Sequence, residues 1–252
     1  MNPGAHTLGR VPAFWQQALH IAAKDVRIYY LKGPNLTFGL LLPAILYGVY
    51  ALGGDVTPAS IAPGMIAAAV LFGAGAMQAV SLPMERSSGS IHLLLSAPMA
   101  PHTLALGKVL AGAAFGVLLA LVYAVLFATM GRVPIRPVAF ALSTVVAAFT
   151  ASALGLAMAA PFGSVPDAMP PATVVRMAML FVSGALRPLT GGPPALALAM
   201  RLVPLTSAVE AYRAAMSPAP LTSAFFLNMT AQAIFGMLFL YIAGALIAVR
   251  DR

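Results

Sequence analysis

Long runs of apolar residues dominate the chain, and short polar segments separate them. A helix needs about 20 mostly apolar residues to cross the hydrocarbon core of a bilayer. Six runs approach this length and predict six transmembrane helices at Leu36–Leu52, Gly64–Pro83, Leu104–Met130, Val138–Ala160, Ala172–Leu189 and Ala224–Val249. Helices are expected rather than barrel strands, because the runs show no alternating pattern and lipid leaves every backbone group to be satisfied internally.

Composition supports this fold class. Apolar residues make up 61% of the 252 residues and charged residues 8%, whereas a soluble domain is about half apolar and a quarter charged. We therefore expect an all-α polytopic membrane protein, with residues 1–252 forming a single transmembrane domain. The net charge of +8 comes from scattered basic residues. We therefore expect no nucleic acid partner, and we expect contact with the lipid bilayer.

The segment that precedes the first run, residues 12–32, is predicted to be an amphipathic helix. Trp15, Leu19, Ala22, Val26 and Tyr29 follow a helical spacing on one face, and Lys24 and Arg27 belong to a polar face. Aromatic residues opposite basic ones are typical of a helix that lies in the membrane interface. The alternative is a helix packed on a soluble partner.

Two polar segments stand out between the predicted spans. Residues 84–103 predict a short helix with exposed leucines, which favours a partner surface. Residues 190–222 are partly apolar but are interrupted by charges and proline, and they predict short re-entrant helices at one membrane surface. Lys and Arg are more frequent in the segments on one side of the predicted spans. This predicts a protein of the cell (plasma) membrane with both termini and residues 84–103 in the cytoplasm and residues 190–222 outside the cell.

The sequence contains no set of catalytic or metal-binding residues. It has no phosphate-binding G-x-x-x-x-G-K-[ST] motif, and its four histidines are scattered. The acidic residues fall at or outside the ends of the predicted spans, which argues against an ion-coupled carrier. We therefore expect neither catalysis nor a cofactor in this chain.

Some polar residues do lie within predicted spans. Gln78, Asn228 and Gln232 are candidates for a translocation path, although hydrogen bonds between helices explain them better. Gly112 and Gly116 form a G-x-x-x-G motif, which we expect to pack within the chain rather than at a dimer seam.

Three motifs follow one another along the chain. The first is Lys24-Asp25-Val26-Arg27 at the end of the lead-in helix. The second is Glu85-Arg86-x-x-Gly89-x-Ile91-x-x-Leu94-Leu95-x-Ala97-Pro98, followed by Gly107-Lys108. The third is Phe181-Val182-Ser183-Gly184 with Pro188, followed by Pro204-Leu205-Thr206 and Ala211-Tyr212-Arg213. Together they resemble the permease subunits of type-2 ATP-binding-cassette (ABC) exporters, especially daunorubicin-resistance-like ones. Val203 stands where the family usually has Asn, and Arg187 is an unusual charge.

The resemblance implies a mechanism and its partners. Two permease subunits, expected here as a homodimer, would pair above two cytoplasmic ATPase subunits that bind ATP and Mg. Residues 84–103 would hold the coupling helix, and its contacts with the ATPase would involve Glu85, Arg86, Ser90, Leu93, Leu94 and Leu95. Helices within 190–222 would form an external gate with Pro204, Glu210 and Arg213. Multidrug efflux in a prokaryote would fit such a subunit.

Other interpretations remain open at this point. A haem-exporter-type ABC permease has a similar first loop, but the segment from Pro204 to Arg213 argues against it. An ion-coupled secondary transporter would need no ATPase, and an intramembrane enzyme would need catalytic residues that the sequence does not offer.

Overall fold

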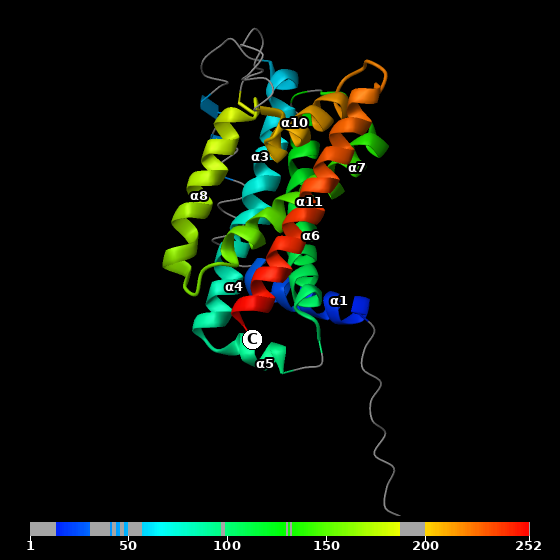
Figure 1. Cartoon of the computed structure of the whole chain (residues 1–252). Coiled ribbons are helices and arrows are strands. Elements are labelled where there is room, and N and C mark those ends of the chain that lie inside the picture. Colours follow the sequence, from blue (N-terminus) through cyan, green and yellow to red (C-terminus); the bar gives the residue numbers. More distant parts are fainter. Residues whose placement is uncertain are drawn as a thin grey trace, which may run out of the picture.

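The fold is a bundle of upright helices, seen in a computed structural model (Figure 1). The structure describes residues 14–30, 57–96, 99–129, 131, 133–186 and 200–251, together with the five positions 41, 44, 45, 48 and 49. Of the side chains in α5, those of His92 and Leu95 are not described. The expected first span, Leu36–Leu52, lies outside the described residues except for those five positions.

The described chain forms helices throughout its length. In chain order they are α1 Phe14–Asp25, the π-helical turn η1 Val26–Tyr30, α3 Pro58–Ala76, α4 Gln78–Ser87, α5 Ser90–Leu95, α6 Pro101–Thr129, α7 Pro137–Ala159, α8 Val165–Val182, α10 Pro204–Ala215 and α11 Ser223–Arg250. Among the described residues, four helices are long and apolar enough to cross a membrane: Pro58–Ser87, which joins α3 and α4, Pro101–Thr129, Pro137–Ala159 and Ser223–Arg250.

These four helices confirm the expected second, third, fourth and sixth spans. The fifth differs, because α8 begins at Val165, before the expected start at Ala172. It takes in Asp167, Pro170 and Pro171 and carries Arg176, so it is less apolar than the other four. Its 18 residues lie alongside the bundle (Figure 1).

Helix α3 occupies the centre of the bundle. It packs against α6, α7 and α10, and its residues from Ile61 to Gly75 are all buried. Helix α11 lies at the outside and buries few of its residues. A helix that is apolar on every side is suited to the interior of a membrane bundle, and one with an exposed apolar face is suited to lipid contact.

Close helix packing depends on small residues in α6. A Cβ atom on Gly112 would lie 2.7 Å from the carbonyl oxygen of Ala74 and would also meet Ser152. A Cβ atom on Gly116 would lie 3.0 Å from the Cβ atom of Ala148. The G-x-x-x-G motif therefore packs α6 against α3 and α7 of the same chain, as expected.

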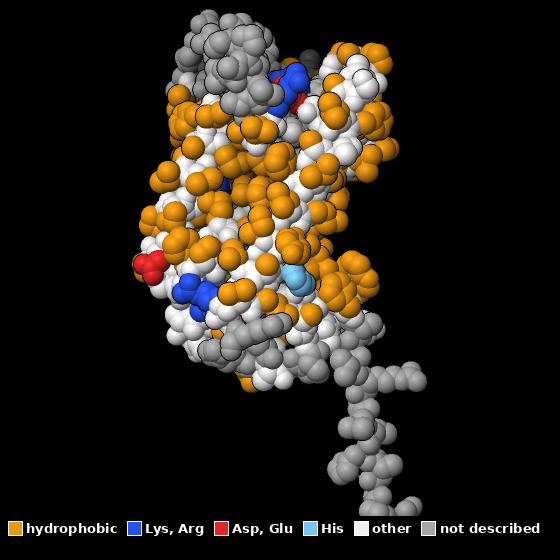
Figure 2. Space-filling view, viewed as in Figure 1, with side chains coloured by type: hydrophobic (Ala, Val, Ile, Leu, Met, Phe, Trp, Pro, Cys, Tyr) orange, Lys and Arg blue, Asp and Glu red, His pale blue; other side chains and the backbone are white. Residues whose placement is uncertain are grey.

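The two ends of the bundle carry different elements. Helix α1, α5 and the C-terminal end of α11 lie at one end, which we call the α5 end, and α10 lies at the other, the α10 end (Figure 1). Charged side chains gather mostly toward the ends of the visible face, with hydrophobic side chains between them (Figure 2). This arrangement puts residues 84–96 and α10 at opposite ends, as the sequence predicts.

Candidate functional site

Four charged side chains from three helices meet at the α5 end of the bundle. Lys108 of α6 places its Nζ atom 3.0 Å from Asp25 Oδ2 and 2.7 Å from Glu85 Oε2. Lys24 Nζ lies 2.5 Å from Glu85 Oε1 and 3.0 Å from Asp25 Oδ1. We call Lys24, Asp25, Glu85 and Lys108 the four-charge cluster. It joins the lead-in helix α1, the end of α4 and the beginning of α6.

The four-charge cluster has no net formal charge, and three of its members are buried, whereas the Lys24 side chain is 31% exposed. Asp25 and Lys108 are 0% exposed, and Glu85 is 2% exposed. Burial by itself lowers the pKa of Lys24, but the carboxylates of Glu85 and Asp25 outweigh it, so the pKa is raised above its ordinary value. Each carboxylate thus faces two ammonium groups, which offsets the cost of removing these charges from water.

The second span ends later than the sequence predicts. Glu85 is the third-last residue of the long helix Pro58–Ser87, so it lies at the end of this span, as expected of the acidic residues. Helix α4 continues past Pro83 to Ser87, so the segment between spans is shorter than residues 84–103. Helix α6 likewise begins at Pro101. The sequence could not show that lysines from two other helices neutralise this carboxylate.

Gln78 forms a second polar contact point beside the cluster. Its Nε2 atom donates to the Lys108 carbonyl oxygen at 2.7 Å and lies 3.0 Å from both Tyr30 Oη and Ser152 Oγ. The side chain is fully buried. Gln78 thus links η1, α6 and α7 to α4, and its geometry is that of a hydrogen bond between helices, the interpretation that the sequence favoured.

Arg86 ties the end of α4 to two other segments. Its Nη2 atom lies 2.7 Å from Asp251 Oδ2, beyond the end of α11. Its Nη1 atom donates to the carbonyl oxygens of Ala160 and Phe162, both at 2.6 Å, in the turn between α7 and α8. The Arg86 side chain is 6% exposed. Glu85 and Arg86 therefore make their contacts within the chain.

Helix α5 is the short helix that residues 84–103 predicted. Gly89, with a φ of 72°, separates it from α4, and its amide donates to the Arg86 carbonyl oxygen at 3.0 Å. A left-handed glycine commonly ends a helix in this way. Ser90 Oγ lies 2.8 Å from Ser88 Oγ. The chain can therefore turn sharply at the end of α4.

The leucines of α5 do not share one environment. Leu93 is 77% exposed. Leu94 is partly buried and packs against the apolar cluster that contains Leu82 and Ile91. Leu93 is therefore the exposed one of the two leucines whose side chains are described in this helix, whereas the expected docking role of Leu95 concerns a side chain outside the described set.

Helix α1 divides its apolar residues between two faces. Ala18, Ile21 and Ala22 are buried, and the helix packs along α6. Trp15 is 63% exposed and Arg27 is exposed, while Lys24 turns into the four-charge cluster. The helix is amphipathic as predicted, but part of its apolar surface and its one lysine serve packing within the chain.

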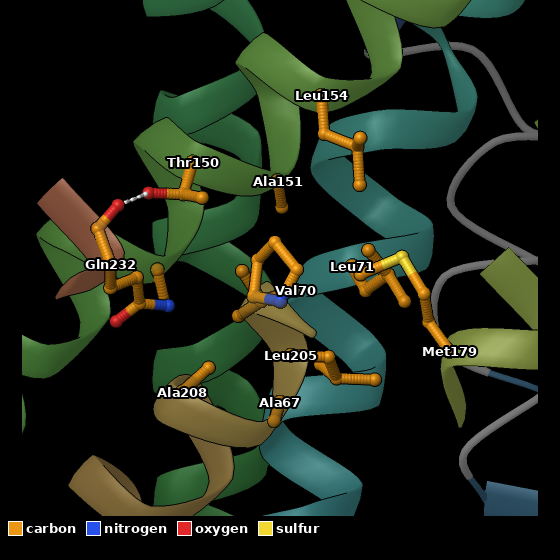
Figure 3. A pocket seen from close by; sticks show the side chains of 12 residues that line it. Ala67, Val70, Leu71, Thr150, Ala151, Leu154, Met179, Leu205, Ala208 and Gln232 are labelled. Atoms are coloured by element: carbon orange, nitrogen blue, oxygen red, sulfur yellow. Dashed lines mark hydrogen bonds between the residues drawn. The ribbon is translucent and has the colours of Figure 1, made fainter. Parts of the chain in front are cut away.

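A small, mainly apolar cavity of about 20 Å³ lies between α3, α7, α8, α10 and α11. Figure 3 shows Leu71, Ala151, Met179 and Leu205 around it, with Gln232 at one side. Gln232 is 2% exposed, and its Oε1 atom has no hydrogen-bond partner. Thr150 Oγ1 donates to its backbone carbonyl oxygen at 2.9 Å (Figure 3). Of the three path candidates, Gln232 thus faces a cavity.

The remaining predicted residues lie near the opposite end from α5. Asn228 is half-buried on α11, one turn before Gln232. Pro204 begins α10 and lines the cavity. Glu210 and Arg213 form an ion pair on the partly exposed side of α10. The structure therefore brings Pro204 and Gln232 to one cavity but leaves Glu210 and Arg213 paired with each other at the surface.

The sequence analysis missed most of the partners in these contacts. Asp25 and Lys108 were read only as parts of motifs, and Asp251 only as one of the acidic residues at or outside the ends of the spans. One signal was available, because Lys108 interrupts the run Leu104–Met130 and a buried lysine needs a carboxylate nearby. The identity of that carboxylate depends on which helices are neighbours.

Taken together, the long apolar helices and the buried bundle define a multi-pass helical membrane protein. The chain belongs to the ABC-2 type transporter family, whose model matches residues 17–217. It is thus a membrane-spanning permease component of an ABC transporter. No match to the chain is found among curated proteins.

Proposed function

We propose that this chain is the membrane subunit of an ATP-driven exporter and that a separate cytoplasmic ATPase docks on α5. The supporting observation is the exposure of Leu93, at 77%, on a short helix that lies at one end of the bundle. An apolar side chain beyond the bundle, in a family of ABC transporter membrane domains, fits a contact with a protein partner.

The four-charge cluster supplies a route from that contact to the spans. Helix α5 is joined through Gly89 to α4, and Glu85 near the end of α4 pairs with Lys24 of α1 and Lys108 of α6. A displacement of α5 would therefore move three helix ends together rather than one loop. Packed helices that can adopt two discrete arrangements would convert such a displacement into a change between an inward-open and an outward-open state.

The proposal includes the assembly of the transporter, its orientation in the membrane and its transport class. Two copies of the chain would pair as a homodimer above two ATPase subunits, which bind ATP and Mg. Both termini would be cytoplasmic in the plasma membrane of a prokaryote, and α10 would contribute an external gate. Efflux of drugs, as in daunorubicin-resistance-like exporters, is the expected transport class.

A matched pair of variants tests the docking surface. Leu93→Asp places a charge on α5, and Leu202→Asp places one on a leucine that is 70% exposed toward the α10 end. The tagged subunit is solubilised from its native membrane and purified, and vanadate-sensitive ATPase activity is measured on the eluate. We expect wild type and Leu202→Asp to retain the ATPase and Leu93→Asp to lose it.

The outcomes separate this proposal from its rivals. If Leu93→Asp retained as much ATPase activity as wild type, α5 would not be the docking surface. Absence of any ATPase from the wild-type eluate would instead favour an ion-coupled carrier. Leu93 is chosen over Leu94 because Leu94 packs inward, so its replacement by Asp would also disturb the fold.

A further inference from the structure

The guanidinium of Arg86 joins segments that are far apart in the chain. Its Nε atom donates to Asp251 Oδ1 at 3.0 Å, and its Nη2 atom donates to Asp251 Oδ2 at 2.7 Å. Its Nη1 atom donates to the carbonyl oxygens of Ala160 and Phe162, both at 2.6 Å. Since an arginine carries five N–H groups, these contacts use almost all the donor capacity of Arg86.

The bonds to carbonyl oxygens cap the C-terminal end of α7. This helix ends at Ala159, and the last carbonyl groups of a helix have no partner within it and carry a partial negative charge. Arg250 of α11 donates to the Pro161 carbonyl oxygen, between the two that Arg86 binds. Two arginines from other helices therefore satisfy three successive carbonyl groups in the turn that leads into α8.

Two adjacent residues in the last turn of α4 thus hold different parts of the bundle. Glu85 binds Lys24 of α1 and Lys108 of α6, whereas Arg86 holds the turn between α7 and α8 and the end of α11. Successive side chains of a helix point about 100° apart, so one turn can serve both sides. Gly89 and α5 follow directly. A movement of α5 can consequently reach α7, α8 and α11 through Arg86.

The pair of Arg86 and Asp251 lies where it can open. Both side chains are nearly buried, at 6% and 7% exposure, but they are at the α5 end of the bundle and not at its centre (Figure 1). If the helix ends separate, water can hydrate both charges, which offsets the loss of the ion pair. Ion pairs at interfaces that rearrange are a common element of two-state transitions.

We propose that Arg86 and Asp251 are positioning residues that form a latch. Their pairing keeps the α5 end of the bundle closed, and the opening of the pair passes a movement of α5 to α7, α8 and α11. This inference rests on the proposed function, and it names the contact through which an ATPase at α5 would reach these three helices.

The test measures how fast buried positions react when the latch is broken. The sequence contains no cysteine, so single cysteines report without interference. The reporter Ile247→Cys replaces a side chain of α11 that is 1% exposed and belongs to the apolar cluster that contains Leu82 of α4. The control reporter Val209→Cys replaces a side chain of α10 that is 0% exposed.

Each reporter is placed in five backgrounds. These are wild type, Arg86→Gln, Asp251→Asn, the double variant Arg86→Gln with Asp251→Asn, and Arg201→Gln, which removes an exposed arginine close to α10 as a control. The purified subunit is reconstituted in phosphatidylcholine nanodiscs, and the rate of its reaction with a water-soluble maleimide is measured.

Ile247→Cys should react at least about tenfold faster with Arg86→Gln or Asp251→Asn, because each leaves a buried charge without its partner and favours opening of this end. The double variant should react no faster than either single variant, since all three break the same contact. Val209→Cys should react slowly in every background, and Arg201→Gln should match wild type. An unchanged rate at Ile247→Cys would overturn the inference. So would equal acceleration at Val209→Cys, which indicates general unfolding.

A second measurement follows Ile247→Cys in the subunit purified together with its ATPase. ATP with vanadate should change the reaction rate in the wild-type background, and Arg86→Gln should abolish this change. No change in wild type, or an equal change in Arg86→Gln, would overturn the inference, because a movement of α5 would then not pass through the latch.

The two measurements separate the latch from the proposed function. The first needs no ATPase. Failure of either one with an ATPase still bound to the subunit would reject only the latch. The expected rates in the first measurement, from a subunit with which no ATPase purifies, would reject only the ATP-driven mechanism.

Discussion

At the scale of single residues, Lys108 shows how a charged group is accommodated inside this bundle. It is fully buried in α6, and the carboxylates of Asp25 and Glu85 lie within 3.0 Å of its ammonium group. Lys24 balances the second negative charge. The removal of any one member leaves a buried charge without compensation, so the cluster is expected to respond to mutation as a unit.

Lys108→Met should destabilise the protein by about 3–5 kcal/mol, because the carboxylates of Asp25 and Glu85 are then left to share Lys24 and one buried negative charge is uncompensated. The double variant Asp25→Asn with Lys108→Met restores neutrality and should recover most of this loss. Thermal unfolding in detergent measures both. A double variant as unstable as the single one would show that charge balance is not what holds the cluster.

The raised pKa of Lys24 predicts how stability changes with pH. A lysine with a higher pKa in the folded state stabilises fully below its ordinary pKa of 10.5, and this contribution is lost as the pH rises through the folded value. The difference in unfolding midpoint between wild type and Lys24→Gln should therefore be constant near neutral pH and shrink above pH 10.5. A difference that grows with pH would contradict the ion pairs described for Lys24.

At the scale of elements, the contacts of α6 explain how one helix joins most of the bundle. Glycines let it approach α3 and α7, and its lysine reaches α1 and α4. Small residues at such positions permit the close approach that drives helix association in lipid, where no hydrophobic effect acts between helices. A side chain that fills this space should separate the helices.

Gly112→Ala tests this packing. The new methyl group would lie 2.7 Å from the Ala74 carbonyl oxygen and 2.8 Å from Tyr30 Oη. Overpacking of this kind costs about 1–3 kcal/mol, and we expect a lower unfolding midpoint. The control is Val122→Leu, since Val122 is 45% exposed on the same helix. Equal midpoints for Gly112→Ala and wild type would mean that α6 can move away from α3 without cost.

At the scale of the whole molecule, the bundle has two chemically different ends. The α5 end holds the four-charge cluster, α5 and the C-terminal end of α11, and the opposite end holds α10. The proposed function requires these ends to lie on opposite sides of the membrane. Because the sequence contains no cysteine, the sidedness can be measured without first removing native thiols.

Single cysteines at Leu93 and Leu202 should report opposite sides. Both side chains are well exposed, at 77% and 70%. In intact cells a membrane-impermeant maleimide should label Leu202→Cys and not Leu93→Cys, and both should react after the membrane is opened. Labelling of Leu93→Cys in intact cells would reverse the proposed orientation.

The apolar runs in the sequence determined the fold class, because lipid leaves few ways to arrange 20 consecutive apolar residues. Four spans, the amphipathic helix α1, the short helix α5 and a short helix within residues 190–222 all follow from local patterns. The predicted start of the fifth span, Ala172, was wrong, because α8 begins at Val165. The first residues of α8 include Asp167, Pro170 and Pro171, which by composition are typical of a loop.

Only the tertiary structure decided which polar groups meet. Asp25 and Lys108 are 83 positions apart and Arg86 and Asp251 are 165 apart, so no local pattern relates them. The same holds for Gln78, which forms a hydrogen bond with the Lys108 carbonyl oxygen of α6, and for Gln232, which faces a cavity. Their environments depend on the order and rotation of the packed helices, and these follow from side-chain fit across the whole bundle rather than from hydrophobicity along the chain.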